Sequence, residues 1–145
     1  LKAKQLIKDE MLLVASPKLI SRQDIDKPEI VFSLPWIEDT STDVTEVFKK
    51  MCVQHQQTIE TIIPVIRADN SVTIIENVLQ GRGYGLANRS LILEHLQSGR
   101  LFNLLGFSQP SPFSLYLVAP EQNFNWEKVK LFEQWLVPLI KDSFE

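Results

Sequence analysis

Residues Thr61–Gly99 decide the fold that is predicted for this chain. Their sequence is TIIPVIRADNSVTIIENVLQGRGYGLANRSLILEHLQSG. This pattern predicts an apolar strand at 62–66, a polar turn, an amphipathic helix from Ser71, a glycine-containing break, a second strand at 84–87, and another helix that stops at Gly99. Strand, helix and strand in this order form a βαβ unit, which is the building block of a parallel sheet.

The flanking segments predict more elements of the same kind. Pro35 has no amide hydrogen for a sheet ladder, so it is expected to close a strand and to leave Trp36 in a loop. A stretch rich in Gln, Pro and Ser at 108–112 favours a turn. Alternating helices and strands indicate the α/β class. The further segments predicted to be regular are strands at 11–15, 30–34, 102–105 and 113–119 and helices at 42–52 and 125–139.

The composition limits the possible functions. A chain of 145 residues forms one domain or two small lobes, and a net charge of −3 argues against a nucleic-acid-binding surface on this piece. The single cysteine excludes an internal disulfide and fits a reducing compartment. No apolar run reaches the roughly 18–20 residues that a transmembrane helix needs. Because the chain begins with neither Met nor a signal peptide, we expect it to be part of a longer protein.

The reactive side chains do not form a catalytic pattern. Cys52 and His55 are three residues apart on one helix, so a thiolate–imidazole pair is geometrically possible, but both lie on or beside an apolar stripe, where a buried thiol is inert. His55 and His95 are the only histidines, and neither has a partner at zinc-ligand spacing. The glycines at 81–85 follow a helix and open a strand, which indicates a helix C-cap and not a phosphate loop. The sequence therefore predicts no catalytic residue, no metal and no cofactor.

Two places suit ligand binding, and each has a structural alternative. Asn70 and Ser71 at a helix start offer amide, hydroxyl and backbone N–H groups to an anion, but the same residues commonly only cap the helix. The indole of Trp36 either fills the edge of the core or forms an apolar wall for a ligand. The sequence leaves both alternatives open.

Six short motifs occur in order along almost the whole chain. They are Glu10–Pro17 (EMLLVASP), Pro35–Ile37 (PWI), Ala68–Ser71 (ADNS), Leu79–Ala87 (LQGRGYGLA), Leu96–Leu101 (LQSGRL), and Tyr116–Pro120 (YLVAP) with Phe132, Trp135 and Leu136 downstream. With these motifs the chain resembles the C-terminal two-thirds of the effector-binding domain of LysR-type transcriptional regulators. The Pro-Trp pair is most similar to the branch that contains glycine-cleavage and β-lactamase activators.

The resemblance implies a periplasmic-binding-protein-like fold with two Rossmann-like subdomains and a small-molecule effector in the cleft between them. Residues 16–112 would form the second subdomain, with a mostly parallel sheet. Residues 1–15 and 113–145 would supply crossing strands and a C-terminal helix to an incomplete first subdomain. Such a protein would be a cytoplasmic bacterial regulator that forms a dimer or tetramer. It would bind DNA only through an N-terminal winged helix-turn-helix that this sequence does not contain, and it would not bind membranes.

The ends of parallel strands meet at one edge of a sheet, so the loops after Leu34, Ala68 and Ala87 are expected to converge there. An anionic or amino-acid-like effector would bind at this edge. A small thiol-dependent enzyme using Cys52 and a lobe of a free-standing solute-binding protein remain as alternatives. The residues predicted to bind the effector are Ser33, Leu34, Trp36, Ile37, Asp69, Asn70, Ser71, Asn88 and Arg89.

Overall fold

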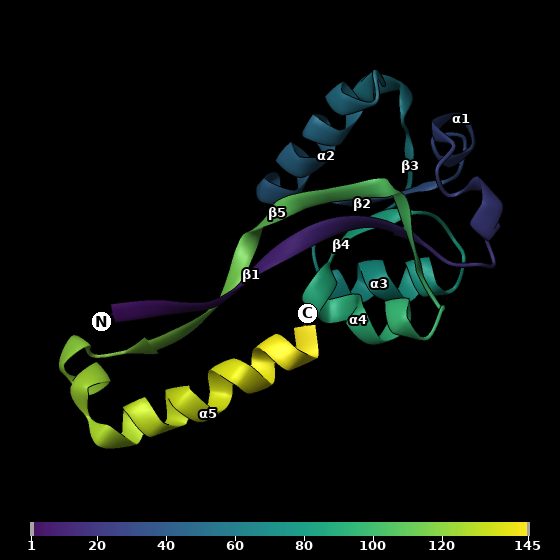
Figure 1. The fold of residues 1–145 in the computed structure, drawn as a ribbon. Helices are drawn as coiled ribbons and strands as arrows, with labels where there is room; N and C mark the ends of the chain where they lie inside the picture. Colours follow the sequence, from purple (N-terminus) through teal and green to yellow (C-terminus); the bar gives the residue numbers. More distant parts are fainter. Residues whose placement is uncertain (1, 145) are drawn as a thin grey trace. The chain divides into compact units, whose positions relative to one another are not determined.

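The computed structural model of the chain describes residues 2–144, in which helices and strands alternate (Figure 1). No helix in this range is long and apolar enough to cross a bilayer. The strands are β1 (Lys2–Ala15), β2 (Trp36–Asp39), β3 (Pro64–Ala68), β4 (Gly85–Asn88) and β5 (Phe102–Ala119). The helices are α1 (Pro28–Val31), α2 (Thr42–Gln54), α3 (Ser71–Leu79), α4 (Arg89–Gln97) and α5 (Glu127–Phe144), with short 3-10 turns at Arg22–Asp24, Ile59–Thr61 and Glu121–Asn125.

The chain divides into two compact units. The larger unit comprises residues 10–112, and the smaller one comprises residues 1–9 and 113–145. Strands β1 and β5 are long enough to contribute residues to both units. Within the smaller unit the ammonium group of Lys4 pairs with the carboxylate of Glu133 at 2.8 Å. The predicted assignment of 16–112 to one subdomain stays a prediction.

The strands form a three-stranded sheet, in the order β4-β1-β5, and a two-stranded sheet of β2 and β3. β2 and β3 pair in parallel, with Asp39 opposite Ala68. β4 pairs with β1 in the antiparallel direction, and β5 is the other neighbour of β1. A parallel bridge joins the start of β2 to the start of β4, where Ile37 N–H donates to the Tyr84 carbonyl at 2.9 Å. Strands β2, β3 and β4 therefore run in one direction, as the βαβ pattern predicts, and the α/β class is confirmed.

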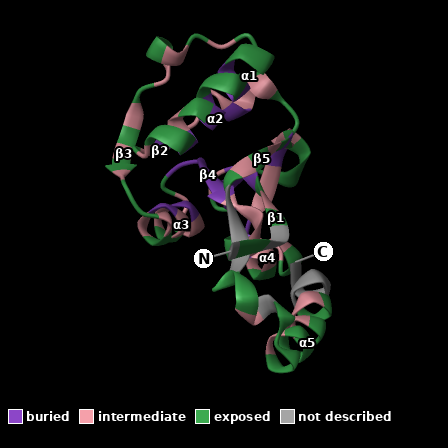
Figure 2. Ribbon diagram, turned by 90° about the vertical axis from the view of Figure 1, so that its left-hand side faces the viewer, coloured by how far each residue is buried: buried purple, intermediate pink, exposed green. Residues whose placement is uncertain are grey.

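Helices cover both faces of this sheet, with α2 on one side and α3 and α4 on the other (Figure 1). Side chains alternate along a strand, so Met11 and Leu13 of β1 enter the core beneath α2, while Leu12 and Val14 enter the core beneath α3 and α4. Buried residues concentrate on the strands and on the inner sides of the helices (Figure 2). The apolar stripe predicted for α2 is confirmed, and its buried members are Val44, Val47, Phe48, Met51 and Cys52.

Both helices of the Thr61–Gly99 segment end in the same way. Gly81 and Gly99 have a φ of +77° and follow α3 and α4 at the position that favours glycine. Arg82 N–H then donates to the Asn77 carbonyl at 3.2 Å, and Arg100 N–H donates to the His95 carbonyl at 2.9 Å. These two bonds have the geometry of Schellman caps, so the interpretation of the glycines as helix terminators is confirmed.

The strand predicted at 30–34 is wrong. This region contains α1 and a turn, and Pro28 occupies the first turn of the helix, where its missing N–H and fixed φ are favourable. Pro35 therefore precedes β2 and does not close a strand, and Trp36 is the first strand residue instead of a loop residue.

The turn predicted at 108–112 is also wrong, because β5 continues through it. The strand lies at the edge of its three-stranded sheet, and edge strands tolerate proline. The irregularity of this strand lies earlier, at Leu105 and Gly106, which both have positive φ. The amide of Leu105 donates to the Ile25 carbonyl at 2.7 Å, so this distortion is fixed by a contact outside the sheet.

Candidate functional site

Three helices of the larger unit begin directly after the parallel strands. α2 follows β2 across residues 39–41, α3 follows β3 across 69–71, and α4 follows β4 across 88–90. We refer to these three segments as the carboxyl edge. The amide of Thr40 donates to the Ala68 carbonyl at 2.9 Å, which holds the first two segments side by side. Ligands of open α/β sheets bind at this kind of edge, since the backbone N–H groups of the helix starts point into it.

The start of α3 is closed by its own cap. Asn70 Oδ1 accepts a hydrogen bond from the Thr73 amide at 2.8 Å. Capping, one of the two roles that the sequence left open for Asn70, is thus present in the structure. The side-chain oxygen of Asn70 is therefore already used. A ligand at this helix could still bind the side-chain NH2 group of Asn70 and the hydroxyl of Ser71.

The start of α2 already holds a carboxylate. Asp39 Oδ1 accepts hydrogen bonds from the Ser41 amide at 2.9 Å and from the Ser41 hydroxyl at 2.6 Å. A negative charge at a helix N-terminus is favoured by the helix dipole, so this arrangement stabilises α2. It also places a fixed carboxylate on the carboxyl edge, where it would attract a cationic group.

The start of α4 has no side-chain cap. Asn88 occupies the N-cap position, but its Oδ1 accepts from the Ser111 hydroxyl of β5 at 2.6 Å and makes no bond to the helix. Asn88 therefore does not give the first amide groups of α4 the side-chain acceptor that an N-cap residue usually supplies. This is the place on the carboxyl edge best suited to an anion.

The structure brings five of the nine predicted binding residues to the carboxyl edge. They are Asp69, Asn70, Ser71, Asn88 and Arg89. The other four lie before β2 or at its amino end, because this strand begins after Pro35 and not before it. These four are Ser33 and Leu34, in the turn after α1, and Trp36 and Ile37, at the start of β2. The convergence expected after Leu34 is therefore wrong, and the segment that follows β2 is 39–41.

Trp36 is a core residue. Its side chain is 2% exposed, and its indole stacks on Phe48 with ring centroids 4.1 Å apart. The Tyr84 ring lies on it at a tilt, with a centroid distance of 4.9 Å. Of the two roles that the sequence left open, filling the core is the one that this structure shows.

Sequence reasoning missed Asp39, Thr40, Ser41 and Ser111. The first three were overlooked because the strand was placed six residues too early, and the rule that polar loops follow strands was applied to the wrong loop. The signal was the segment Trp36–Asp39, in which two apolar residues are followed by two acidic ones. Ser111 had no signal, because only the tertiary fold brings β5 next to Asn88.

Cys52 has the surroundings of an inert thiol. It is 2% exposed, and burial, followed by the charge of Glu60, raises its pKa above the ordinary value of 9.0. Burial, followed by the effect of Cys52, also raises the pKa of the Tyr84 hydroxyl. A catalytic cysteine needs the opposite shift, because the thiolate is the nucleophile. The geometry thus opposes the thiol-dependent enzyme left open by the sequence.

Comparison with known proteins gives a consistent family. The sequence model described as the LysR substrate binding domain matches residues 1–140. The glycine cleavage system transcriptional activator homolog of Haemophilus influenzae is 26% identical over 146 residues, which cover 99% of this chain and 46% of that protein. The chain thus spans about half the length of this curated relative.

Solved structures share the fold at low sequence identity. The effector domain of the transcriptional regulator AmpR of Pseudomonas aeruginosa is 15% identical with a TM-score of 0.70, covering 97% of this chain and 65% of its own. An effector binding domain of Citrobacter freundii with three substitutions is 19% identical with a TM-score of 0.71, and the match covers 96% of this chain and 68% of that one. The regulatory domain of CrgA, a LysR-type regulator of Neisseria meningitidis, is 16% identical with a TM-score of 0.65, and the match covers 96% of this chain and 68% of that one. The chain belongs to the LysR substrate binding domain family.

Proposed function

We propose that this chain senses a small-molecule effector on behalf of a LysR-type transcriptional regulator. The family match along residues 1–140 carries the proposal. The polar, partly uncapped carboxyl edge supports it, because it offers a place where a small polar molecule can bind.

The effector that suits this edge carries a carboxylate, and an amino acid suits it best. Its carboxylate would bind at the start of α4, beside Asn88 and Arg89, where the Asn88 side chain does not cap the helix. Its ammonium group would face Asp39, whose carboxylate is held by Ser41. β2 and β4 are joined by a parallel bridge at Trp36 and Tyr84, so the helix starts that follow these two strands lie at the same edge. A small zwitterion would reach from one helix start to the other.

Binding would regulate DNA indirectly. A ligand shifts a conformational equilibrium only when it binds one arrangement more tightly than the other. In our proposal the effector favours one arrangement of a cytoplasmic homo-oligomer, and this changes how a DNA-binding module outside this chain grips its site. The chain itself has a net charge of −3 and is not expected to contact DNA.

A binding screen with a charge-changing variant tests the proposal. Amino acids and small carboxylates are tested for their ability to raise the melting temperature of the protein, since a ligand that binds only the folded state stabilises it. Asn88→Asp keeps an oxygen that can accept from Ser111 but adds a negative charge beside the expected carboxylate. We expect at least a tenfold loss of affinity, which corresponds to about 1.4 kcal/mol.

The control is Gln23→Glu, which makes the same change of charge in an exposed 3-10 turn outside the carboxyl edge. It should leave the affinity unchanged. If no compound of either class stabilises the protein, or if Asn88→Asp and Gln23→Glu bind the ligand equally well, the assignment of the carboxyl edge as the effector site is wrong.

A further inference from the structure

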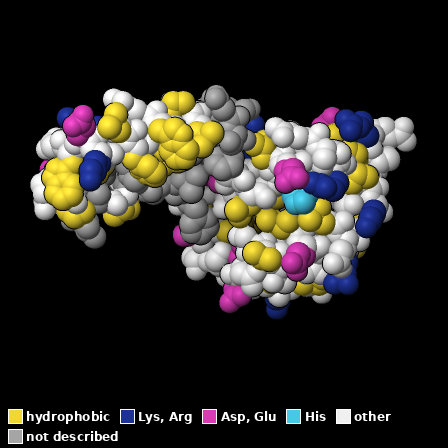
Figure 3. Space-filling view, turned by 90° about the horizontal axis from the view of Figure 1, so that it is seen from below, with side chains coloured by type: hydrophobic (Ala, Val, Ile, Leu, Met, Phe, Trp, Pro, Cys, Tyr) yellow, Lys and Arg dark blue, Asp and Glu magenta, His cyan; other side chains and the backbone are white. Residues whose placement is uncertain are grey.

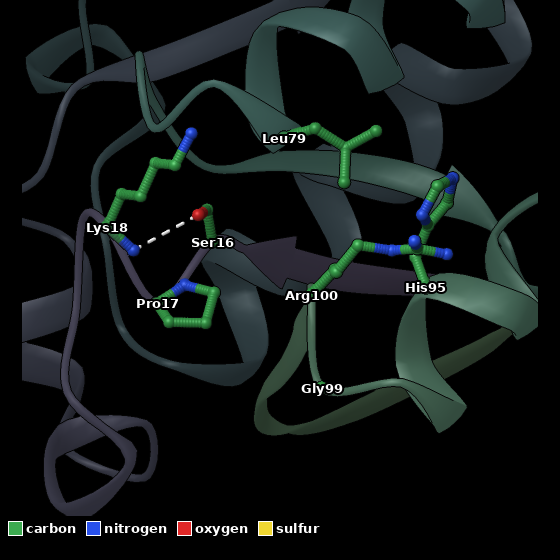
Figure 4. A pocket seen from close by; sticks show the side chains of 7 residues that line it. All are labelled: Ser16, Pro17, Lys18, Leu79, His95, Gly99 and Arg100. Carbon is green, nitrogen blue, oxygen red and sulfur yellow. Dashed lines mark hydrogen bonds between the residues drawn. The ribbon is translucent and has the colours of Figure 1, made fainter.

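A hollow lies on the larger unit at the opposite side of the sheet from the carboxyl edge. It has a volume of about 420 Å³. β1 runs antiparallel to β4, so the loop that follows β1 lies at the amino end of β4, away from the carboxyl edge. The residues that line the hollow are Ser16, Pro17, Lys18, Leu79, His95, Gly99 and Arg100 (Figure 4).

Both walls of the hollow are fixed by backbone hydrogen bonds. On one side, the Ser16 hydroxyl accepts from the Lys18 amide at 3.0 Å, and the Ser16 carbonyl accepts from the Leu19 amide at 2.9 Å. On the other side, the Schellman cap of α4 fixes Gly99 and Arg100. Such walls do not need to be ordered when a ligand binds, and small-molecule sites are commonly preformed in this way.

The charges around the hollow are mostly positive. The ammonium group of Lys18 makes no ion pair with any residue that the structure describes. Arg100 pairs only loosely with Glu94, at 3.5 Å, and the Glu94 side chain is 89% exposed. An exposed pair of this kind contributes little free energy, so a bound anion can replace it. Figure 3 shows this face, where a histidine, basic and acidic side chains lie together beside hydrophobic ones.

The floor of the hollow is apolar except for one ring nitrogen of His95. Leu79 at the end of α3 and the ring of Pro17 contribute hydrophobic surface. Nδ1 of His95 is buried and makes no hydrogen bond within the described part of the chain. Figure 4 places the His95 ring beside the Arg100 guanidinium, with Lys18 on the facing wall. The hollow thus combines an apolar floor with cationic groups on two sides.

The cations also have a simpler explanation. α3 and α4 end here, and basic residues are favoured at helix C-termini. Two of the last carbonyls of each helix, however, already accept hydrogen bonds from the backbone amides of its Schellman cap. Lys18 belongs to neither helix, so complementing a helix dipole does not account for its position at the hollow.

We propose that this hollow is a second ligand site, distinct from the carboxyl edge, which binds a small carboxylate with an apolar body. The carboxylate lies between Lys18 and Arg100, and the apolar part covers Leu79 and Pro17. The volume is within the range of roughly 300–1,000 Å³ found for small-molecule sites. The site would let the domain respond to a second compound without competition for the carboxyl edge.

Titration of the protein with 3-phenylpropionate, followed by amide NMR, tests this proposal. We expect the amide signals of Lys18 and Gly99 to shift, while those of Asn70 and Asn88 stay in place. The neutral analogue 3-phenylpropan-1-ol and the short anion acetate should each bind at least about fivefold more weakly, because the first lacks the charge and the second lacks the apolar body.

Variants decide which groups carry the binding. Lys18→Gln and Arg100→Gln should each lower the affinity for 3-phenylpropionate about fivefold, since each removes a charge-assisted contact. Lys50→Gln, which removes an exposed charge on α2, should have no effect. The proposal is overturned if 3-phenylpropionate fails to bind at 10 mM, if the alcohol or acetate binds equally well, if the shifts occur at the carboxyl edge, or if the three variants behave alike. A negative result with 3-phenylpropionate would not contradict the effector site proposed at Asn88, because different amide signals report binding at the two sites.

Discussion

The indole of Trp36 and the phenyl ring of Phe48 lie parallel, with their planes only 12° apart and their centroids 4.1 Å apart. This stack joins the first residue of β2 to the middle of α2, and so it fastens one helical layer to the sheet. Offset stacking of aromatic rings contributes about 0.5–1.5 kcal/mol beyond the burial of their surface. The position of Trp36 at the amino end of β2 thus serves the fold.

Truncation of this side chain should therefore destabilise the protein as a whole. We expect Trp36→Ala to lower the free energy of unfolding by about 3–5 kcal/mol, because it leaves a large cavity in a packed core. Chemical denaturation followed by circular dichroism measures this change. Trp126→Ala, at a position 56% exposed in the smaller unit, is the matched control and should cost less than about 1 kcal/mol. Similar losses for both variants would contradict the core assignment.

Cys52 should react slowly in the native protein. At pH 8 an exposed free thiol reacts with a thiol reagent within minutes. Burial of Cys52 raises the pKa of its thiol and blocks access of the reagent. We expect Ellman's reagent to label Cys52 at a rate set by opening of the structure, and to label it rapidly in denaturant. Labelling of the native protein as fast as of the denatured protein would revive the thiol-dependent alternative.

The same pKa shift gives stability a defined pH dependence. A thiol whose pKa is higher in the folded state than in the unfolded state stabilises the fold below the unfolded pKa, and this contribution is lost as the pH rises. The free energy of unfolding should consequently fall as the pH is raised past 9.0, the ordinary pKa of the thiol. Denaturant titrations at pH 7.5 and 10 measure this change in the free energy of unfolding. The change should be smaller in Cys52→Ala.

The segments with strong local signals were predictable. The apolar stripe of α2 and the glycine stops after α3 and α4 follow from residue spacing and from a backbone conformation that only glycine adopts easily. The motif order likewise indicated a LysR-type domain, and the family match confirms it.

The errors occurred where local signals conflict. Residues 30–34 are an apolar run too short to separate a buried strand from a helix by periodicity. Pro28 was the useful signal, since proline is favoured in the first turn of a helix. The prolines at 110 and 112 suggested a turn, yet an edge strand tolerates them. The contact between Asn88 and Ser111 depends on the tertiary fold, and no sequence pattern reports it.

The two terminating glycines offer a matched pair of substitutions. Both have φ +77°, so alanine at either position is strained by about 1 kcal/mol. A Cβ at Gly99 meets open space, whereas a Cβ at Gly81 comes within 2.9 Å of Lys18 Cβ. We expect Gly99→Ala to cost about 1 kcal/mol and Gly81→Ala about 2–3 kcal/mol, measured by thermal unfolding. Equal costs would mean that the loop at Lys18 yields to the added methyl group.

The exposed apolar side chains of α5 should drive self-association. Several large apolar side chains on and just before this helix are exposed, among them Trp135 at 62%. Exposed apolar patches of this kind mark interaction surfaces. We expect the protein to sediment as a dimer or larger species at high micromolar concentration, and Phe132→Gln with Trp135→Gln to shift it toward monomer. Val53→Gln, at an exposed position on α2, is the control. A monomer for the unmodified protein would contradict the expectation.

Asn70 and Asn88 occupy equivalent N-cap positions, but only Asn70 bonds to its helix, through the Thr73 amide. Asn70→Ala should therefore lower the free energy of unfolding by about 1 kcal/mol, the usual cost of losing an N-cap. Asn88→Ala removes the acceptor of Ser111 and also the side-chain amide beside the proposed anion site, so we expect a smaller loss of stability but a larger loss of effector affinity. Denaturant titration with and without the stabilising compound separates the two effects. If Asn70→Ala weakens binding more than Asn88→Ala does, the anion site lies at the start of α3 and not of α4.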